Sequence, residues 1–334
     1  MIQHLAIDRF KSIRSLSIPC RKVNVFIGEP DTGKTNILEA LYLPSRLAWG
    51  QPLDSFLRLN PQIGFEALFY QQFLDQPFQI LMRLSPSRKG IGDELVISAT
   101  IQGEQRNLYL HIPGATPFAV SFGQTSHLPH LDWIRCYAYS TSEQWAYTTG
   151  FHLGTNVVAP PWGHNLLYIA RHAQKVNNFL RDLISPLGWK LFFDQTQKTL
   201  RLLHLRGEQV SLYNLDLLSD SLKRLFFYGS ILLTSQEVVL VFDEPDVFAF
   251  PPYPKTLGEM IAGDSSNQFF LITHNPYFLS AIAEKTPVDN LGIFVCFRDP
   301  EGATSVKLLS SEQVSRIIEL GANVFFNLDE LLTS

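Results

Sequence analysis

The chain has 334 residues, of which 46% are hydrophobic and 17% charged, and its formal net charge is −4. This length allows one large domain or two modest ones, and the balance is that of a globular protein rather than a disordered one. Because the net charge is negative, no overall basic field favours nucleic acid, and such contact would need a local patch. Charge of this kind is more often a solvated face, and the one candidate stretch is N-terminal: Arg9, Lys11, Arg14, Arg21 and Lys22.

The cysteine content and the lengths of the apolar runs indicate the cellular compartment of the protein. Cys20, Cys136 and Cys296 lie far apart in apolar stretches, and we interpret them as small core residues. A sparse, odd count is typical of the reducing cytosol. No run approaches the roughly 18 apolar residues of a membrane helix, and the N-terminus lacks the apolar run of a signal peptide. We expect a cytoplasmic protein without membrane contact.

The first 44 residues predict strands, a loop and a helix. Short strands are expected at 2–8, 15–18 and 23–27, the last of which (VNVFI) ends in a glycine, as a buried strand does on entering a loop. From Lys34 the apolar residues recur at helical spacing, and Pro44 is expected to end that helix.

The middle of the chain, from about 45 to 213, is less regular. Strands are expected at 78–84, 94–101 and 107–112, and an amphipathic helix at 165–184. A small meander follows at 190–193, 200–205 and 209–212. No sustained heptads occur, so a long coiled-coil arm is not expected.

The C-terminal part alternates helices with strands. A helix is expected at 217–233, continuous apolar strands at 237–242 and 269–273, a strand pair at 292–297 and 305–309, and a last helix at 311–320. Short apolar strands of this type are buried on both faces. The alternation predicts an α/β fold with a largely parallel sheet.

The sharpest motif is a GxxxxGKT phosphate-binding loop, formed by Gly28, Glu29, Pro30, Asp31, Thr32, Gly33, Lys34 and Thr35. Its glycines let backbone N–H groups converge on a polyphosphate at the N-terminus of the next helix. Lys34 would reach the β- and γ-phosphates, and the Thr35 hydroxyl would bind Mg²⁺. A plain glycine turn is the alternative, but the strand-loop-helix context argues against it. Pro30 lacks an N–H and removes one donor.

A second motif places two carboxylates at the end of a buried strand, in VVLVFDEP. In an open α/β sheet this is the edge where ligands bind. Asp243 would hold the Mg²⁺ shell, and Glu244 would polarise the attacking water. Acids at strand ends are often solvated turn residues, and only the pairing with the phosphate loop favours the catalytic interpretation.

Two further polar sites are less specific. His274 follows a buried strand and could contact the γ-phosphate, although a lone histidine is more often structural. Ser219 and Asp220 begin a predicted helix, where they are either ordinary N-cap residues or phosphate ligands. His127 and His130 have no nearby Cys in the sequence, so we do not expect zinc.

Together these motifs resemble the ABC-type ATPase heads of the SMC/RecF-like group, especially compact OLD-like prokaryotic AAA family ATPases, without the nuclease domain that OLD proteins carry. The resemblance rests on residues 8–13 (DRFKSI), 22–28 (KVNVFIG), 33–41 (GKTNILEAL), 218–220 (LSD, like the signature motif), 242–245 (FDEP, like Walker B) and 273–277 (THNPY, like the switch histidine).

The resemblance implies a P-loop NTPase fold, an ABC-type head with a mixed, largely parallel sheet. Residues 1–44 and 214–334 would form the nucleotide-binding core, and 45–213 an inserted α+β lobe on the signature side. Residues 28–36, with Asn36 as the last, would hold ATP and Mg²⁺. ATP would be sandwiched in a homodimer, with Ser219 and Asp220 of one subunit against the loop of the other.

Partners are implied only by analogy. The heads that this chain resembles drive a separate effector, such as a nuclease or toxin, or act on DNA in repair or antiviral defence. Two alternatives remain open, the motor subunit of an ABC transporter and an ATP-binding structural module with little turnover.

The chain departs from the family pattern at several positions. Ser221 replaces the usual glycine of the signature, and no Q-loop glutamine can be placed. The family's histidine-containing stretch after Asp-Glu-Pro is replaced by residues 246–252 (DVFAFPP), whose apolar side chains belong either to a partner surface or to the core.

Overall fold

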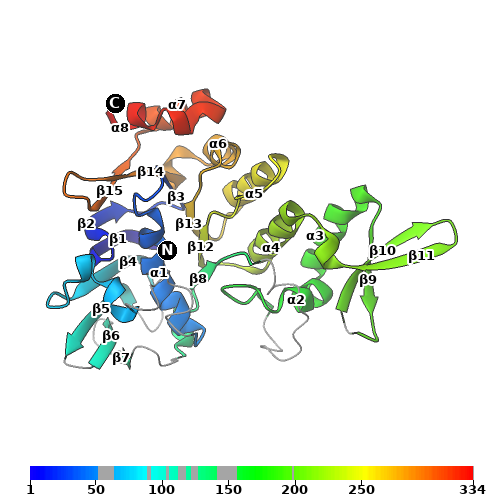
Figure 1. Ribbon diagram of the computed structural model, residues 1–334, viewed down its shortest axis with the longest axis horizontal. Helices are drawn as coiled ribbons and strands as arrows, with labels where there is room; N and C mark the ends of the chain where they lie inside the picture. Colours follow the sequence, from blue (N-terminus) through cyan, green and yellow to red (C-terminus); the bar gives the residue numbers. More distant parts are fainter. Residues whose placement is uncertain are drawn as a thin grey trace.

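Five strands predicted from the sequence, together with β8 (Ile134–Tyr137), which was not predicted, assemble into one six-stranded sheet (Figure 1). Its other members are β3 (Val23–Gly28), β12 (Val239–Asp243), β13 (Gln268–Ile272), β14 (Leu291–Arg298) and β15 (Thr304–Leu308). The order is β15-β14-β3-β13-β12-β8, and only β15 is antiparallel to its neighbour. The mixed, largely parallel sheet is therefore confirmed. The computed structural model describes residues 1–51, 64–88, 92–102, 105–111, 118–121, 127–140, 156–197 and 199–333.

A second sheet is antiparallel and covers one side of the first. It is ordered β2-β1-β4-β5-β6-β7, from β1 (Ile2–Phe10), β2 (Ile13–Pro19), β4 (Phe78–Arg88), β5 (Gly92–Gln102), β6 (Gln105–His111) and β7 (Phe118–Ser121). Helix α1 (Lys34–Ala48) shares a hydrophobic core with this sheet and with one face of the parallel sheet. Side chains alternate along β12, so that Val239 and Val241 enter this core while Leu240 and Phe242 enter the other.

The opposite face of the parallel sheet is covered by helices. They are α4 (Asp220–Thr234), α5 (Pro252–Gly263), α6 (Pro276–Lys285), α7 (Ser311–Leu320) and α8 (Leu328–Thr333). Short 3-10 turns occur at Gly64–Leu68, Tyr70–Gln72, Pro129–Leu131, Ser185–Leu187, Leu215–Leu217, Val288–Asn290 and Gly321–Phe326. In the described residues, no helix has the length and apolar character needed to cross a membrane.

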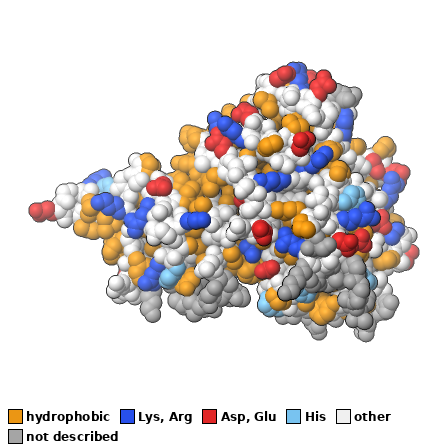
Figure 2. Space-filling model, turned by 180° about the vertical axis from the view of Figure 1, so that it is seen from behind, with side chains coloured by type: hydrophobic (Ala, Val, Ile, Leu, Met, Phe, Trp, Pro, Cys, Tyr) orange, Lys and Arg blue, Asp and Glu red, His pale blue; other side chains and the backbone are white. Residues whose placement is uncertain are grey.

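A side lobe projects beyond α4 at the right of Figure 1. It consists of α2 (Leu166–His172), α3 (Gln174–Ile184) and a three-stranded sheet of β9 (Lys190–Asp194), β10 (Thr199–Arg206) and β11 (Gln209–Asn214). From behind, apolar side chains lie along this lobe among lysines and arginines (Figure 2). The meander predicted at 190–212 is confirmed.

Two predicted helix limits are wrong. The helix from Lys34 does not end at Pro44 but runs to Ala48. Proline in a helix interior costs roughly 3 kcal/mol, and burial of Leu43, Leu47 and Ala48 offsets that cost. The single helix expected at 165–184 is interrupted at Ala173, whose backbone is extended. The Asn177 side chain donates to the Ala170 carbonyl at 2.8 Å, which satisfies a group exposed by the break.

The middle of the chain contributes to all three sheets. Its β4 pairs with β1, its β8 pairs with β12, and its last three strands form the side lobe. The division into a core of 1–44 and 214–334 and an inserted lobe of 45–213 stays a prediction. The three cysteines are buried and unpaired with one another, as their apolar surroundings predicted.

Candidate nucleotide site

The loop between β3 and α1 adopts left-handed backbone conformations of the kind that glycine favours. Gly28, Asp31 and Gly33 all have positive φ, at 144°, 60° and 91°. A Cβ at Gly33 would lie 1.9 Å from the Thr304 hydroxyl oxygen, so no larger residue fits there. Gly33 is the last residue before α1, and the loop therefore curls over the N-terminus of that helix.

The Lys34 side chain is held over this loop. Its Nζ donates to the carbonyl oxygens of Gly28 at 3.0 Å and Glu29 at 2.5 Å, and to the Thr32 hydroxyl at 3.4 Å. Burial lowers the pKa of Lys34, against the attraction of nearby acids that include Glu244 and Asp243. The hydrogen bonds to the loop oxygens therefore fix the position of the Lys34 amino group at the loop.

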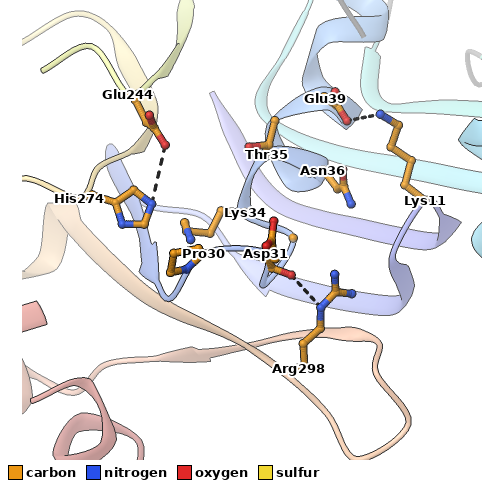
Figure 3. Close-up of a pocket in the computed structure, with 11 residues that line it drawn as sticks. Lys11, Pro30, Asp31, Lys34, Thr35, Asn36, Glu39, Glu244, His274 and Arg298 are labelled. Atoms are coloured by element: carbon orange, nitrogen blue, oxygen red, sulfur yellow. Dashed lines mark hydrogen bonds and ion pairs between the residues drawn. The ribbon is translucent and has the colours of Figure 1, made fainter. Parts of the chain in front are cut away.

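The ends of β12 and β13 bring two predicted residues together. These strands are parallel neighbours, with Asp243 opposite Ile272, so Glu244 and His274 emerge at the same edge. Glu244 Oε1 lies 3.7 Å from His274 Nε2, and both side chains are partly exposed (Figure 3). Burial, and then the charge of Lys34, lower the pKa of His274, while Glu244 acts in the opposite direction. The imidazole is therefore mainly neutral at neutral pH.

One cavity of about 520 Å³, the main cavity, joins the loop to this pair. Figure 3 shows Glu244 and His274 on the Lys34 side of the loop and Lys11, Glu39 and Arg298 on the other side. The size suits a drug-sized or nucleotide-sized ligand, since such pockets measure about 300–1,000 Å³. The lining residues are Lys11, Pro30, Asp31, Gly33, Lys34, Thr35, Asn36, Glu39, Glu244, His274 and Arg298.

Three of these lining residues were not predicted as site residues. Lys11 forms an ion pair with Glu39, and their side chains are 9% and 1% exposed. Arg298 Nε donates to the Asp31 carbonyl at 2.9 Å and so braces the loop. Arg298 ends β14, which is parallel to β3, and a basic residue at the carboxyl edge of a predicted strand is the signal that could have identified it.

A smaller side cavity of about 220 Å³ holds the predicted metal ligands. Thr35 and Asp243 both line it, together with Glu244, Tyr139 and Arg224. One hydroxyl and one carboxylate fit Mg²⁺, which usually takes few protein ligands and completes its shell with phosphate and water oxygens. Within the described ranges, no group of three or more His, Cys, Asp or Glu side chains could hold a metal by itself.

Ser219 and Asp220 lie outside the lining of the main cavity. Ser219 is the N-cap of α4 and its hydroxyl accepts from the Leu222 N–H at 3.4 Å. Asp220 accepts from the Tyr139 hydroxyl at 2.8 Å and from Arg224 Nε at 3.0 Å. Burial acts to raise the pKa of Asp220, but these hydrogen bonds outweigh it and the pKa is lowered.

The apolar stretch after Glu244 is not part of the core. Phe248 is 89% exposed and Phe250 is 63% exposed. Of the two interpretations left open by the sequence, the core is excluded for these two rings. Phe248 lines a second cavity together with Glu244 and His274, and contiguous exposed apolar side chains are typical of contact surfaces.

Comparison with solved structures identifies the fold. A crystal structure of an Smc head bound to the C-winged helix domain of ScpA superimposes with a TM-score of 0.58 at 15% sequence identity, covering 94% of this chain and 99% of that chain. The SMC head domain from Thermotoga maritima gives a TM-score of 0.46 at 17% identity, covering 92% and 99%. No protein-family model and no curated protein sequence matches the chain. The fold is therefore that of the SMC head domains.

Proposed function

We propose that the chain binds ATP with Mg²⁺ and hydrolyses the terminal phosphate. The observation that carries this proposal is that Lys34, the curled loop, Glu244 and His274 all line the main cavity. The loop N–H groups and Lys34 would hold the β- and γ-phosphates, and Thr35 and Asp243 would hold the magnesium ion that neutralises phosphate charge.

Hydrolysis needs a water oriented towards the γ-phosphorus, on the side away from the leaving ADP oxygen. Glu244 suits this role because its carboxylate lies at the cavity wall and can accept the proton that the attacking water loses. A neutral His274, 3.7 Å from Glu244, can hold that water or a γ-phosphate oxygen by a hydrogen bond. The P–O bond to ADP breaks as the new bond forms, and inorganic phosphate leaves.

A homodimer that sandwiches ATP is the second part of the proposal. Ser219 is exposed and lies outside the main cavity of its own chain, so only a second copy could bring it to that cavity's phosphate. Phe248, which is 89% exposed, offers apolar area in a second cavity that Glu244 and His274 also line.

We further propose a separate partner, either an effector protein or DNA. The solved Smc head is bound to the C-winged helix domain of ScpA, which illustrates that this fold accepts a protein partner. A role in DNA repair or antiviral defence is proposed by analogy alone. A cytoplasmic location is proposed from the sparse, odd cysteine count of the sequence.

Steady-state phosphate release tests the enzymatic proposal. Wild type should release phosphate from ATP, Lys34→Ala should lose nucleotide binding, and Glu244→Gln should bind ATP while releasing phosphate at least about 100-fold more slowly. Lys285→Ala, at an exposed lysine ending α6, is the matched control. Tight binding with no release by wild type would instead favour a structural module, and equal binding by Lys34→Ala would refute the site.

A further inference from the structure

Arg224 lies on α4 between the predicted signature residues and the predicted hydrolytic residues. Its Nε donates to Asp220 Oδ2 at 3.0 Å, and its guanidinium carbon lies 4.3 Å from the centre of the Tyr139 ring. The Tyr139 hydroxyl donates to the other oxygen of Asp220 at 2.8 Å. These three side chains form a closed set of contacts, which we call the Asp220–Arg224–Tyr139 triad.

The triad reaches the side cavity. Arg224 and Tyr139 line that cavity together with Thr35, Asp243 and Glu244. The side chain of Arg224 is only 12% exposed, so its charge is poorly screened by water. Burial raises the pKa of Tyr228 and of Asp246, and the charge of Arg224 acts against that rise in both. The field of the guanidinium therefore extends around the end of β12.

The planar guanidinium of arginine allows Arg224 to bind Asp220 and a second acceptor at the same time. Its planar head carries five N–H donors, and Asp220 takes the Nε donor here. Among the described residues the two terminal nitrogens have no hydrogen-bond partner in the structure. Held by Asp220 on one side and by the Tyr139 ring on the other, the head is pre-organised for one more acceptor.

We propose that Arg224 is a positioning residue for hydrolysis, which couples the Ser219–Asp220 end of α4 to the Glu244 side of the nucleotide site within one subunit. When a second subunit's nucleotide contacts Ser219 and Asp220, the hydrogen bond between Asp220 and Arg224 changes. The position of the water or phosphate oxygen beside Glu244 then changes as well. This inference rests on the proposed ATPase function and deepens it by naming a route from the dimer contact to the chemistry.

An ordinary helix-surface ion pair is the competing explanation. Arg224 and Asp220 are four residues apart, and exposed pairs of that spacing contribute about 0.3–0.5 kcal/mol to stability. Such a pair would affect unfolding slightly and turnover not at all. It would also give no role to the Tyr139 hydroxyl.

The test compares four variants of the full chain with wild type: Arg224→Gln, Arg224→Lys, Tyr139→Phe, and Arg316→Gln as control. Arg316 forms an exposed ion pair with Glu319 on α7 and so matches the helix-surface case. Fluorescent-nucleotide affinity, melting temperature, kcat and KM are measured for each. Tyr139→Phe keeps the ring against the guanidinium and removes only the hydroxyl donor.

We expect Arg224→Gln to lower kcat about 10- to 100-fold, as loss of a positioning contact does, with ATP affinity within about threefold of wild type. Arg224→Lys should recover part of the loss, Tyr139→Phe should lower kcat less and in the same direction, and Arg316→Gln should match wild type. An unchanged kcat in Arg224→Gln, or a loss that a lower assay temperature restores, overturns the inference while the ATPase proposal stands. If wild type itself releases no phosphate, the proposed function fails and the inference falls with it.

Discussion

At the scale of single residues, Asp246 is a buried acid with a strongly raised pKa. It is 3% exposed, its Oδ2 accepts from the Thr273 hydroxyl at 2.8 Å, and its Oδ1 has no hydrogen-bond partner within the described ranges. Burial raises the pKa of Asp246 to about 7. The native state therefore binds a proton that the unfolded chain releases near pH 4.

This raised pKa predicts a pH-dependent effect of Asp246→Asn. Between about pH 4 and 7 the native protein holds more protons than the unfolded one, so wild-type stability falls as pH rises through that window. Asparagine does not titrate and can still accept from Thr273. The stability of the variant relative to wild type should therefore rise with pH, by up to about 4 kcal/mol for three pKa units.

Urea unfolding at pH 4.5 and pH 8 measures this difference. Asp289→Asn, at an exposed position, is the control. A stability difference between Asp246→Asn and wild type that is the same at both pH values would show that the carboxyl does not titrate in this range.

At the scale of elements, Gln268 ties the two large sheets together. This side chain is 1% exposed and belongs to β13, yet its Oε1 accepts from the Ile2 N–H at 2.7 Å. Its Nε2 donates to the carbonyls of Ile2 at 2.7 Å and Arg21 at 2.8 Å. The N-terminal strand is thereby held to the parallel sheet through a side chain rather than through a strand ladder.

Replacing Gln268 by methionine should destabilise the protein by roughly 2–4 kcal/mol, because buried backbone groups lose their partners at about 1–3 kcal/mol each. The volume is nearly kept, so cavity formation contributes little. The denaturant midpoint measures the effect, with Gln174→Met at an exposed position as control. Equal midpoints for Gln268→Met and the control would mean that water replaces these bonds without cost.

Elements with a strong local signal could be predicted, and contacts between distant segments could not. The VNVFIG strand and the GKT helix start are local patterns, and both lie where expected. The prediction that the helix ends at Pro44 was wrong because burial of the following turn, a tertiary effect, outweighs the local cost of proline. Lys11 reaches the main cavity only through the way the two sheets pack, which no local pattern fixes.

At the scale of the whole molecule, the proposed ATP sandwich combines surfaces of two copies. The phosphate loop, Glu244 and His274 line one cavity, while Ser219 is the N-cap of α4 and lies outside that lining. If two copies pair about a two-fold axis, each site combines the loop of one subunit with Ser219 of the other. ATP with Glu244→Gln should then give a dimer by light scattering at tens of micromolar, and a monomer under those conditions would refute the sandwich.

Mixing two inactive variants tests the same arrangement through activity. Lys34→Ala removes nucleotide from its own loop, and Ser219→Arg blocks the face that its partner's nucleotide needs. In a mixed dimer both defects fall on one composite site and the other site is intact. An equal mixture should therefore recover about a quarter of wild-type phosphate release, since half the dimers are mixed and each has one working site of two. If each chain hydrolyses ATP alone, Ser219→Arg stays active by itself and mixing adds nothing.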